Sequence, residues 1–283
     1  MYEMKTLRSL RLFRLEMERV RALGRMIGFV PTMGALHEGH LSLVRKARRE
    51  NRIVVVSIFV NPLQFGSRED LRRYPRPTQR DWLALAREKV DYLFTPTRRF
   101  LYPAGYQTFV EVTGLSRPLC GRLRPGHFRG VATVVTKLFN LVRPHRAYFG
   151  LKDYQQALIV ERLVRDLNFD VKLKLLPLVR DRDGLALSSR HAYLSYEERR
   201  RAQSIFQSLA WAKAEVQKGH RNLKSLRRGI LQRLQGNLDR IDYVEFVEAK
   251  SLQPVQSIRG RSVIALAGWV GKTRLIDNVI IQP

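Results

Sequence analysis

The sequence predicts a doubly wound α/β domain built on a parallel sheet, followed by a smaller α+β domain. The run from Ile53 to Val60 is apolar and rich in β-branched side chains, which is typical of a strand buried on both faces. Similar short runs alternate along the chain with segments of helical spacing, and this alternation indicates parallel strands joined by helices. After about Ser189 the pattern changes to two long charged helical segments and then two strands, which predicts the second domain.

The spacing of apolar residues places each element in chain order. In the first domain we expect helices over residues 6–23, 40–48, 82–89, 131–142 and 154–167. The strands between them are expected at residues 27–30, 53–60, 92–94, 147–149 and 171–179. In the second domain, helices at residues 196–218 and 223–238 should precede strands at 241–248 and 262–269. The predicted domains are therefore residues 1–183 and residues 184–283.

The composition excludes several classes of protein. With 283 residues, of which 45% are hydrophobic, the chain can bury a substantial core. No apolar run approaches the ~20 residues that span a bilayer, so we expect no membrane partner. The single cysteine, Cys120, rules out an intrachain disulfide and a cysteine-cluster zinc site. We expect Cys120 to be a small packing residue in a cytoplasmic protein.

The formal net charge of +27 allows two interpretations. In one, the surface binds the phosphates of a nucleic acid. In the other, the charge belongs to a solvated, arginine-rich surface on a protein with a different task. The arginines are spread over the whole chain, whereas a dedicated nucleic-acid module concentrates them. We therefore favour the second interpretation and expect no specific nucleic-acid partner.

The first candidate site is the segment from Met33 to His40, which follows a predicted strand and opens a helix. Loops at this place in an α/β sheet hold ligands, and the free N–H groups at a helix start attract phosphate. Gly34 and Gly39 permit a tight turn and a close approach of backbone to ligand. His37 and His40 are three residues apart and can donate hydrogen bonds to phosphoryl oxygens. The alternatives are a zinc pair, which needs a third ligand, or histidines that only cap the helix.

Neutral amides follow the predicted strand that ends near Val60. Asn61 and Gln64 flank Pro62, which ends the strand because it has no N–H to donate. Amides at this position can bind hydroxyls and carboxylates, and the alternative is a simple turn. The basic loop of residues 122–130 leads into a predicted helix, where it either binds an anion or forms an ordinary surface loop.

Two later segments carry charged and hydroxyl groups. Lys152 can neutralise a phosphate and Asp153 can accept hydrogen bonds from ribose hydroxyls, unless Asp153 is only a helix cap. Ser188, Ser189 and Arg190 place two hydroxyls before a fixed cation, a pattern that suits a polyphosphate or, alternatively, a polar linker.

Two further patterns are set aside. Residues 268–273 include a Gly-Lys-Thr string, but two residues separate its glycines where a P-loop has four, and no helix pattern follows. The basic run of residues 199–201 stands beside Glu197 and Glu198 in a predicted helix, so we interpret it as a solvated helix face.

Taken together and in order, these segments resemble the pantothenate synthetase (pantoate–β-alanine ligase) family of the nucleotidylyltransferase superfamily. The matching strings are residues 30–40, 57–65, 124–131, 152–156, 183–190 and 271–278. Any one string is weak by itself, but the ordered set spans nearly the whole chain and is highly specific.

The resemblance implies a reaction in two steps. ATP and pantoate give pantoyl adenylate and pyrophosphate, and the amine of β-alanine then attacks the acyl adenylate to give pantothenate and AMP. It also implies Mg²⁺, a homodimer, a Rossmann-like domain of residues 1–183 that binds nucleotide and pantoate, and a C-terminal lid domain of residues 184–283.

The resemblance also implies roles for individual residues. His40, His37 and Lys152 would be catalytic, and no residue would belong to a dedicated metal site. Gln64, Gln156 and Asn61 would bind pantoate, with Gln64 also beside β-alanine. The ATP-binding residues would be Met33, Gly34, Ala35, Leu36, His37, Glu38, Gly39, His40, Gly150, Leu151, Lys152, Asp153, Val179, Leu187, Ser188, Ser189 and Arg190.

The chain departs from the family pattern at two places. Leu151 stands where the family usually has glutamate, which removes a carboxylate next to Lys152. His191 and Ala192 replace the usual Asn-Arg pair after Arg190, at the expected hinge of the lid.

Overall fold

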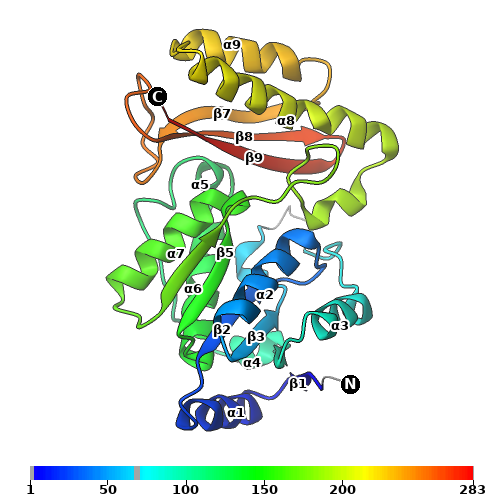
Figure 1. Ribbon diagram of the computed structural model, residues 1–283, viewed down its shortest axis with the longest axis vertical. Coiled ribbons are helices and arrows are strands. Elements are labelled where there is room, and N and C mark those ends of the chain that lie inside the picture. Colours follow the sequence, from blue (N-terminus) through cyan, green and yellow to red (C-terminus); the bar gives the residue numbers. More distant parts are fainter. Residues whose placement is uncertain (1–2, 67–70, 283) are drawn as a thin grey trace. The chain divides into compact units, whose positions relative to one another are not determined.

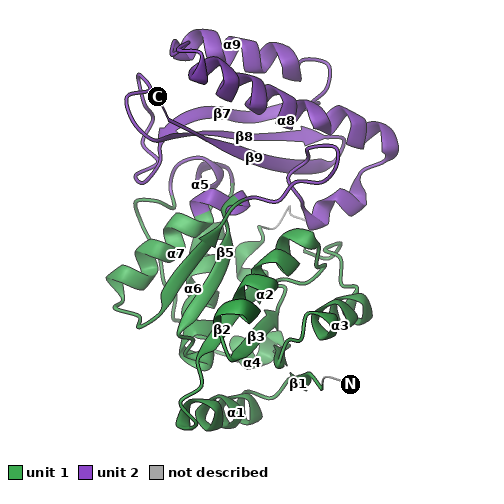
Figure 2. Cartoon of the chain, viewed as in Figure 1, with its two compact units in different colours: residues 1–116, 124–151, 156–177 green, residues 117–123, 152–155, 178–283 purple. Residues whose placement is uncertain are grey.

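A computed structural model describes residues 3–66 and 71–282 of the chain (Figure 1). The chain forms two compact units, which Figure 2 colours separately. Unit 1 comprises Met1–Ser116, Arg124–Leu151 and Gln156–Pro177. Unit 2 comprises Arg117–Leu123, Lys152–Gln155 and Leu178–Pro283, so two short segments from earlier in the chain pack with its C-terminal part. The division at residue 183 into a substrate-binding domain and a lid remains a prediction.

Unit 1 is built on a parallel sheet of six strands, in agreement with the predicted fold class. The strands lie in the order β1-β4-β3-β2-β5-β6 and span Lys5–Leu7 (β1), Ile27–Thr32 (β2), Ile53–Ile58 (β3), Tyr92–Phe94 (β4), Arg146–Gly150 (β5) and Lys172–Leu176 (β6). The chain lays β3 and then β4 on one side of β2 and returns to place β5 on its other side. The connections therefore reverse direction between β2 and β5, which is the topological switch point where α/β sheets bind ligands.

Helices cover both faces of this sheet because neighbouring strand residues point to opposite sides. Val30 packs with α2, whereas its neighbour Phe29 meets Phe139 of α6 with ring centroids 6.4 Å apart. The helices that include unit 1 residues are Leu10–Ala22 (α1), Glu38–Glu50 (α2), Thr78–Arg87 (α3), Arg98–Leu101 (α4), His127–Val142 (α6) and Tyr154–Asp166 (α7). The first two residues of α7 pack with unit 2.

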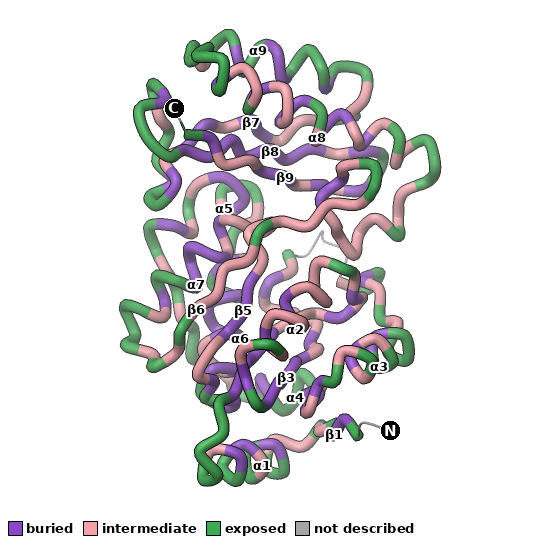
Figure 3. The backbone as a smooth tube through the Cα atoms, viewed as in Figure 1, coloured by how far each residue is buried: buried purple, intermediate pink, exposed green. Residues whose placement is uncertain are grey.

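Unit 2 has an antiparallel sheet of three strands in the order β7-β8-β9, spanning Arg240–Glu248, Ser262–Val270 and Thr273–Ile281. Figure 3 shows its central strand, β8, buried along nearly its whole length. Helices Tyr196–Gln217 (α8) and Leu223–Leu234 (α9) share a hydrophobic core with the sheet. The short helix Cys120–Leu123 (α5) belongs to the same unit, and Cys120 is buried. Among the described residues, no helix is long and apolar enough to cross a membrane.

Several elements differ from the sequence predictions. The expected helix of residues 6–23 begins at Leu10, because Ser9 caps it and residues Lys5–Leu7 form the edge strand β1 instead. Strand β6 ends at Leu176, directly before Pro177, which cannot donate to a sheet. Strand β9 was not predicted. The rejected P-loop string proves to be the tight turn between β8 and β9, with Gly271 at a φ of 56°.

Candidate functional site

The carboxyl ends of β2, β3 and β5 place three predicted binding segments at one edge of the unit 1 sheet. These strands are adjacent and parallel, so Met33, Asn61 and Gly150 each follow or end a strand at the same edge. Because the switch point also lies between β2 and β5, this edge is the candidate site of unit 1.

The segment after β2 has an unusual backbone. Gly34 and Ala35 both adopt left-handed conformations, with φ values of 83° and 50°. The N–H of Gly34 donates to the Thr32 hydroxyl at 3.2 Å. An alanine pays a conformational cost for a positive φ, so this turn needs support from elsewhere in the fold.

Asp81 of α3 supplies that support. Its two carboxylate oxygens accept the N–H groups of Ala35 and Leu36, each at 2.8 Å, and the side chain is only 2% exposed. Burial raises the pKa of the Asp81 carboxyl, and the two backbone hydrogen bonds and Arg80 partly oppose this effect. A buried carboxylate with both oxygens bonded to backbone N–H groups is a strong and geometrically specific clamp.

His37 and His40 lie together at the N-terminus of α2. Their ring centroids are 4.1 Å apart, His37 is the N-cap residue, and its backbone N–H points to Nδ1 of His40 at 3.4 Å. With Nδ1 as acceptor, a neutral His40 ring carries its proton on Nε2, where it can donate to a phosphoryl oxygen. Among the described residues, no group of three His, Cys, Asp or Glu side chains is arranged to hold a metal ion.

Asn61 and Gln64 belong to a buried turn after β3. Residues Pro62–Gln64 form a 3-10 turn capped by Asn61, whose Nδ2 donates to Gln64 Oε1 at 3.1 Å and to the carbonyl of Gly130 at 3.0 Å. The hydroxyl of Tyr102 donates to Asn61 Oδ1 at 2.9 Å. Asn61 is 1% exposed, so its amide is engaged within the protein and fixes the orientation of Gln64.

Gln64 also meets the segment after β2. Its Nε2 lies 3.0 Å from the sulfur of Met33, so two of the predicted binding segments are in contact. The backbone of Gln64 is held from the other side, where His127 Nδ1 lies 2.7 Å and Arg124 Nη2 lies 3.2 Å from its carbonyl oxygen.

Residues 124–130 of the predicted basic loop thus have a role that neither sequence interpretation included. They hold the turn that carries Gln64 through hydrogen bonds, and Gly130 allows α6 to approach that turn closely. A Cβ atom on Gly130 would lie 2.3 Å from the carbonyl oxygen of Leu63, which is far inside van der Waals contact. Any larger residue there would force α6 away from the turn.

In unit 2, the predicted ATP-binding residues Val179 and Leu187–Arg190 lie on one folded segment. The N–H of Leu187 donates to the carbonyl of Val179 at 3.0 Å, so the two residues face each other across a hairpin. Ser188 caps the 3-10 helix Ser189–Tyr193 by accepting the N–H of Arg190 at 3.2 Å. Asp181 ties the hairpin to α8 through an ion pair with Arg199.

Lys152 and Asp153 lie in the same unit, where the charge of Lys152 acts on His191. Lys152 Nζ and Asp153 Oδ1 are 3.5 Å apart, and the Lys152 side chain is 21% exposed. Burial lowers the pKa of His191 to about 4, and the nearby cations Arg199 and Lys152 act in the same direction against Asp181. His191 is therefore neutral at physiological pH, and Lys152 and Arg190 supply the positive charge of this segment.

The remaining predicted residues follow β5. Gly150 is the last residue of β5, Leu151 begins the 3-10 turn Leu151–Asp153, and Gln156 lies in the first turn of α7.

Sequence reasoning missed Asp81 because the helix was expected to begin at Trp82. The signal was present, since Asp81 stands one helical turn before the fully buried Leu85, and a carboxylate on the buried face of a helix indicates a specific partner.

Comparisons with known proteins cover both units. A family model described as pantoate-beta-alanine ligase matches residues 4–280. The pantothenate synthetase of Thermotoga neapolitana is 55% identical over 266 residues, which are 93% of this chain and 95% of that protein. A crystal structure of pantothenate synthetase from Thermus thermophilus has a TM-score of 0.94 at 45% identity and covers 99% of this chain and 100% of its own. Pantoate-beta-alanine ligase from Francisella tularensis, complexed with beta-gamma ATP and beta-alanine, has a TM-score of 0.83 at 36% identity over 98% of each chain.

Replacing Asp81 with asparagine should loosen the turn after β2. The amide offers one acceptor oxygen where the carboxylate offers two, so one of the Ala35 and Leu36 N–H groups loses its partner. We expect hydrogen exchange at these two amides to speed up by roughly 10–100-fold, the equivalent of about 1.5–3 kcal/mol for a charged hydrogen bond. Asp91→Asn is the matched control, because Asp91 accepts the N–H of Val54 at 2.7 Å elsewhere in unit 1. Unchanged exchange at Ala35 and Leu36 in Asp81→Asn would contradict the assigned support.

His191 should make the protein less stable in mild acid. Its pKa is lowered from 6.5 to about 4, so between these values the unfolded chain binds more protons than the folded one. The free energy of unfolding should therefore decrease as the pH falls from 6.5 towards 4, through this residue among others. In His191→Asn the decrease should be smaller. Urea unfolding of both proteins across this pH range measures the difference, and parallel curves would show that His191 contributes nothing.

Proposed function

This chain belongs to the pantoate–β-alanine ligase family, and from that premise we propose how its residues catalyse the reaction. ATP and pantoate are converted to pantoyl adenylate and pyrophosphate, and β-alanine then displaces AMP to give pantothenate. The observation that carries the proposal is the contact at the switch-point edge between Gln64 and Met33, which begins the segment that leads to the histidine pair at the start of α2. An anion-binding helix start thus lies beside a neutral amide that suits a hydroxy acid.

In the first step, a pantoate carboxylate oxygen attacks the α-phosphorus of ATP, and the bond to the pyrophosphate oxygen breaks. Little covalent chemistry is required of the protein, so positioning and charge neutralisation provide most of the catalysis. We assign His40 and His37 to phosphoryl oxygens through the helix start they share. Lys152 and Arg190 are assigned to the negative charge that accumulates on the nucleotide.

Gln64 and Gln156 are assigned to pantoate, and Gln64 also to the neighbourhood of β-alanine. Asn61 acts through Gln64, because its own amide hydrogens are donated to Gln64 and to the backbone of Gly130. The nucleotide contacts are assigned to Met33–His40, Gly150–Asp153 and Val179. This division leaves the neutral amides for the hydroxy acid and the cations for the nucleotide.

In the second step, the neutral amine of β-alanine attacks the acyl carbon, and the bond between that carbon and the AMP oxygen breaks. The proton released by the amine must leave the site, and the departing phosphate oxygens can accept it. Acyl adenylates react readily with water, so the site must exclude solvent while the intermediate is present. We assign that task to Leu187–Arg190 and regard residues 184–283 as the lid.

Mg²⁺ is proposed as part of the nucleotide substrate, where it neutralises charge on the phosphates. Such an ion takes most of its ligands from phosphate and water and needs only one or two carboxylates from the protein. We further propose a cytoplasmic location, a homodimer and no specific nucleic-acid partner.

Labelled pyrophosphate provides the direct test of the two-step order. With ATP, Mg²⁺ and pantoate but no β-alanine, the enzyme should exchange label between pyrophosphate and ATP, because adenylation requires no amine. Adding β-alanine should then release AMP and pantothenate in equal amounts. A protein that forms pantothenate but shows no exchange without β-alanine would rule out the free-standing first step.

His40→Ala should reduce turnover strongly. Removing one group that stabilises charge in a transition state typically lowers kcat by roughly 10²–10³-fold. The fold should persist, since His40 lies in the first turn of α2 outside the hydrophobic core of unit 1. His220→Ala is the control, because His220 lies in unit 2 with a side chain that is 67% exposed. Near-normal kcat in His40→Ala would remove this residue from the mechanism.

A further inference from the structure

We propose that Asp277 and Asn278 of β9 are positioning residues that hold Lys152 and the Val179–Arg190 segment in a fixed arrangement. The inference rests on the proposed function, which assigns these two parts of unit 2 to the nucleotide. Asp277 and Asn278 end one of the strings on which the family resemblance rests, and the mechanism above gives that string no role.

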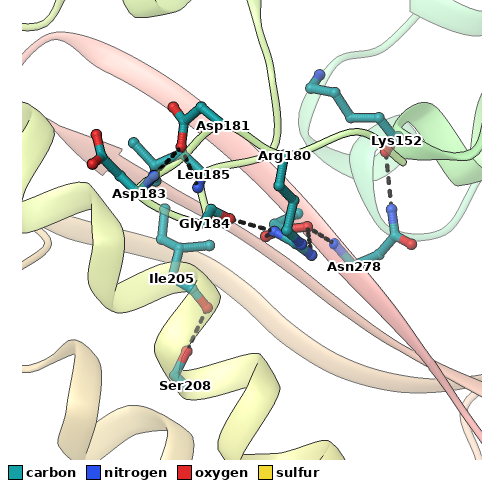
Figure 4. A network of polar contacts seen from close by, with 10 residues as sticks. Lys152, Arg180, Asp181, Asp183, Gly184, Leu185, Ile205, Ser208 and Asn278 are labelled. Atoms are coloured by element: carbon teal, nitrogen blue, oxygen red, sulfur yellow. Dashed lines mark hydrogen bonds and ion pairs between the residues drawn. The ribbon is translucent and has the colours of Figure 1, made fainter. Parts of the chain in front are cut away.

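Asp277 fixes the hairpin through a buried ion pair. Its carboxylate oxygens accept hydrogen bonds from both terminal nitrogens of Arg180, with N–O distances of 2.6 and 3.0 Å. The Asp277 side chain is 2% exposed. The same guanidinium donates to the carbonyl of Gly184 at 2.9 Å (Figure 4), and it lies 4.5 Å from the ring centre of Phe206. A bidentate pair that is stacked on a ring and bonded to backbone leaves Arg180 little freedom.

The hairpin closes tightly around this pair. Gly184 has a φ of 83°, and a Cβ atom there would lie 2.2 Å from the ring of Phe206. The hairpin therefore packs directly on α8, and its two strands meet at the bridge between Arg180 and Ala186. Leu187–Arg190 follow this bridge at once, so the orientation of Arg180 sets where the proposed ATP contacts begin.

Asn278 fixes the backbone of Lys152. Its Nδ2 donates to the carbonyl of Lys152 at 2.9 Å (Figure 4), and the residue is 9% exposed. Successive side chains of a strand point to opposite faces of the sheet. Leu275 and Ile281 share the helix-covered face with Asp277, and Asn278 points to the other face. One strand thus holds the hairpin on one side and Lys152 on the other.

The arrangement links two cationic segments through adjacent residues of a regular strand. Buried polar pairs contribute little net stability compared with apolar residues of the same size, so we assign to the Asp277–Arg180 pair the role of specifying one geometry. The consequence for catalysis is that Lys152 and Arg190 keep a defined separation, as the phosphates of one nucleotide require.

Two isosteric variants test this role. Asn278→Asp keeps the shape of the side chain but replaces the N–H donor with a carboxylate that repels the Lys152 carbonyl. Asp277→Asn keeps the shape but removes the charge that holds Arg180. We expect each variant to raise the KM for ATP by about 10-fold or more. A tenfold change corresponds to a loss of roughly 1.4 kcal/mol of binding free energy. The KM for β-alanine should change less than about 2-fold, because a lost orienting contact acts on the nucleotide alone.

Asp242→Asn is the matched control on the same sheet. Asp242 forms a comparable ion pair with Arg274, at 2.7 Å, and contacts neither Lys152 nor the hairpin in any hydrogen bond or ion pair of the described residues. It should lower the melting temperature without changing the KM for ATP. If the two test variants behave like this control, Asp277 and Asn278 only stabilise the fold and the proposal is wrong.

The test remains informative if the proposed function fails. Equilibrium dialysis of radiolabelled ATP compares nucleotide affinity without any turnover, and we expect the same loss of affinity in both test variants. A wild-type protein that binds ATP but never forms pantoyl adenylate would refute the function and leave this comparison valid. If Asp277→Asn does not fold, Asn278→Asp and Asn278→Ala decide, because neither breaks an ion pair.

Discussion

Parallel pairing of β2 on both of its sides is the constraint on which the unit 1 site depends. β3 and β5 flank it in the same direction, so the chain leaves all three strands at one edge of the sheet. The backbone N–H and C=O groups of the loops at this edge have no neighbouring strand to hydrogen-bond with. Buried polar side chains provide the hydrogen bonds instead. Asp81 does so for the turn after β2, and Asn61, His127 and Arg124 do so around Gln64. The proposed binding residues are thus supported by polar groups that are hydrogen-bonded to the backbone around them.

The candidate residues of the two units differ in charge. The Gln64 turn of unit 1 uses amides and backbone, whereas the candidate residues of unit 2 include Lys152 and Arg190 beside a histidine that stays neutral. Burial, which keeps His191 uncharged, also spares Lys152 an additional repulsion. The overall excess of positive charge is therefore a poor guide to the site, since what matters is the few cations that the fold holds in place.

The sequence predicts the regular part of this structure well, because long amphipathic helices and buried β-branched strands carry strong periodic signals. It predicts less where partners are distant. Strand β1 has three residues and exists because β4 pairs with it, and β9 mixes apolar residues with polar ones such as Asp277, whose partner Arg180 is 97 positions away. The residues of the candidate site could be predicted from motifs that occur in a fixed order along the chain. The distant partners of the residues that support them could not. Nothing local indicates that residue 127 holds the carbonyl of residue 64, or that Asp81 serves a turn 45 residues away.

The bond between Asn278 and the Lys152 carbonyl joins residues that are 126 positions apart. During synthesis on the ribosome, residues 117–123 and 152–155 emerge long before the strands they pack with in unit 2. Strand β9 reaches Ile281, so this unit cannot close until that strand has been translated and has left the exit tunnel. A nascent chain, or one terminated before β9, therefore lacks the hydrogen bond that holds the Lys152 backbone, and this contact forms only after β9 has been made.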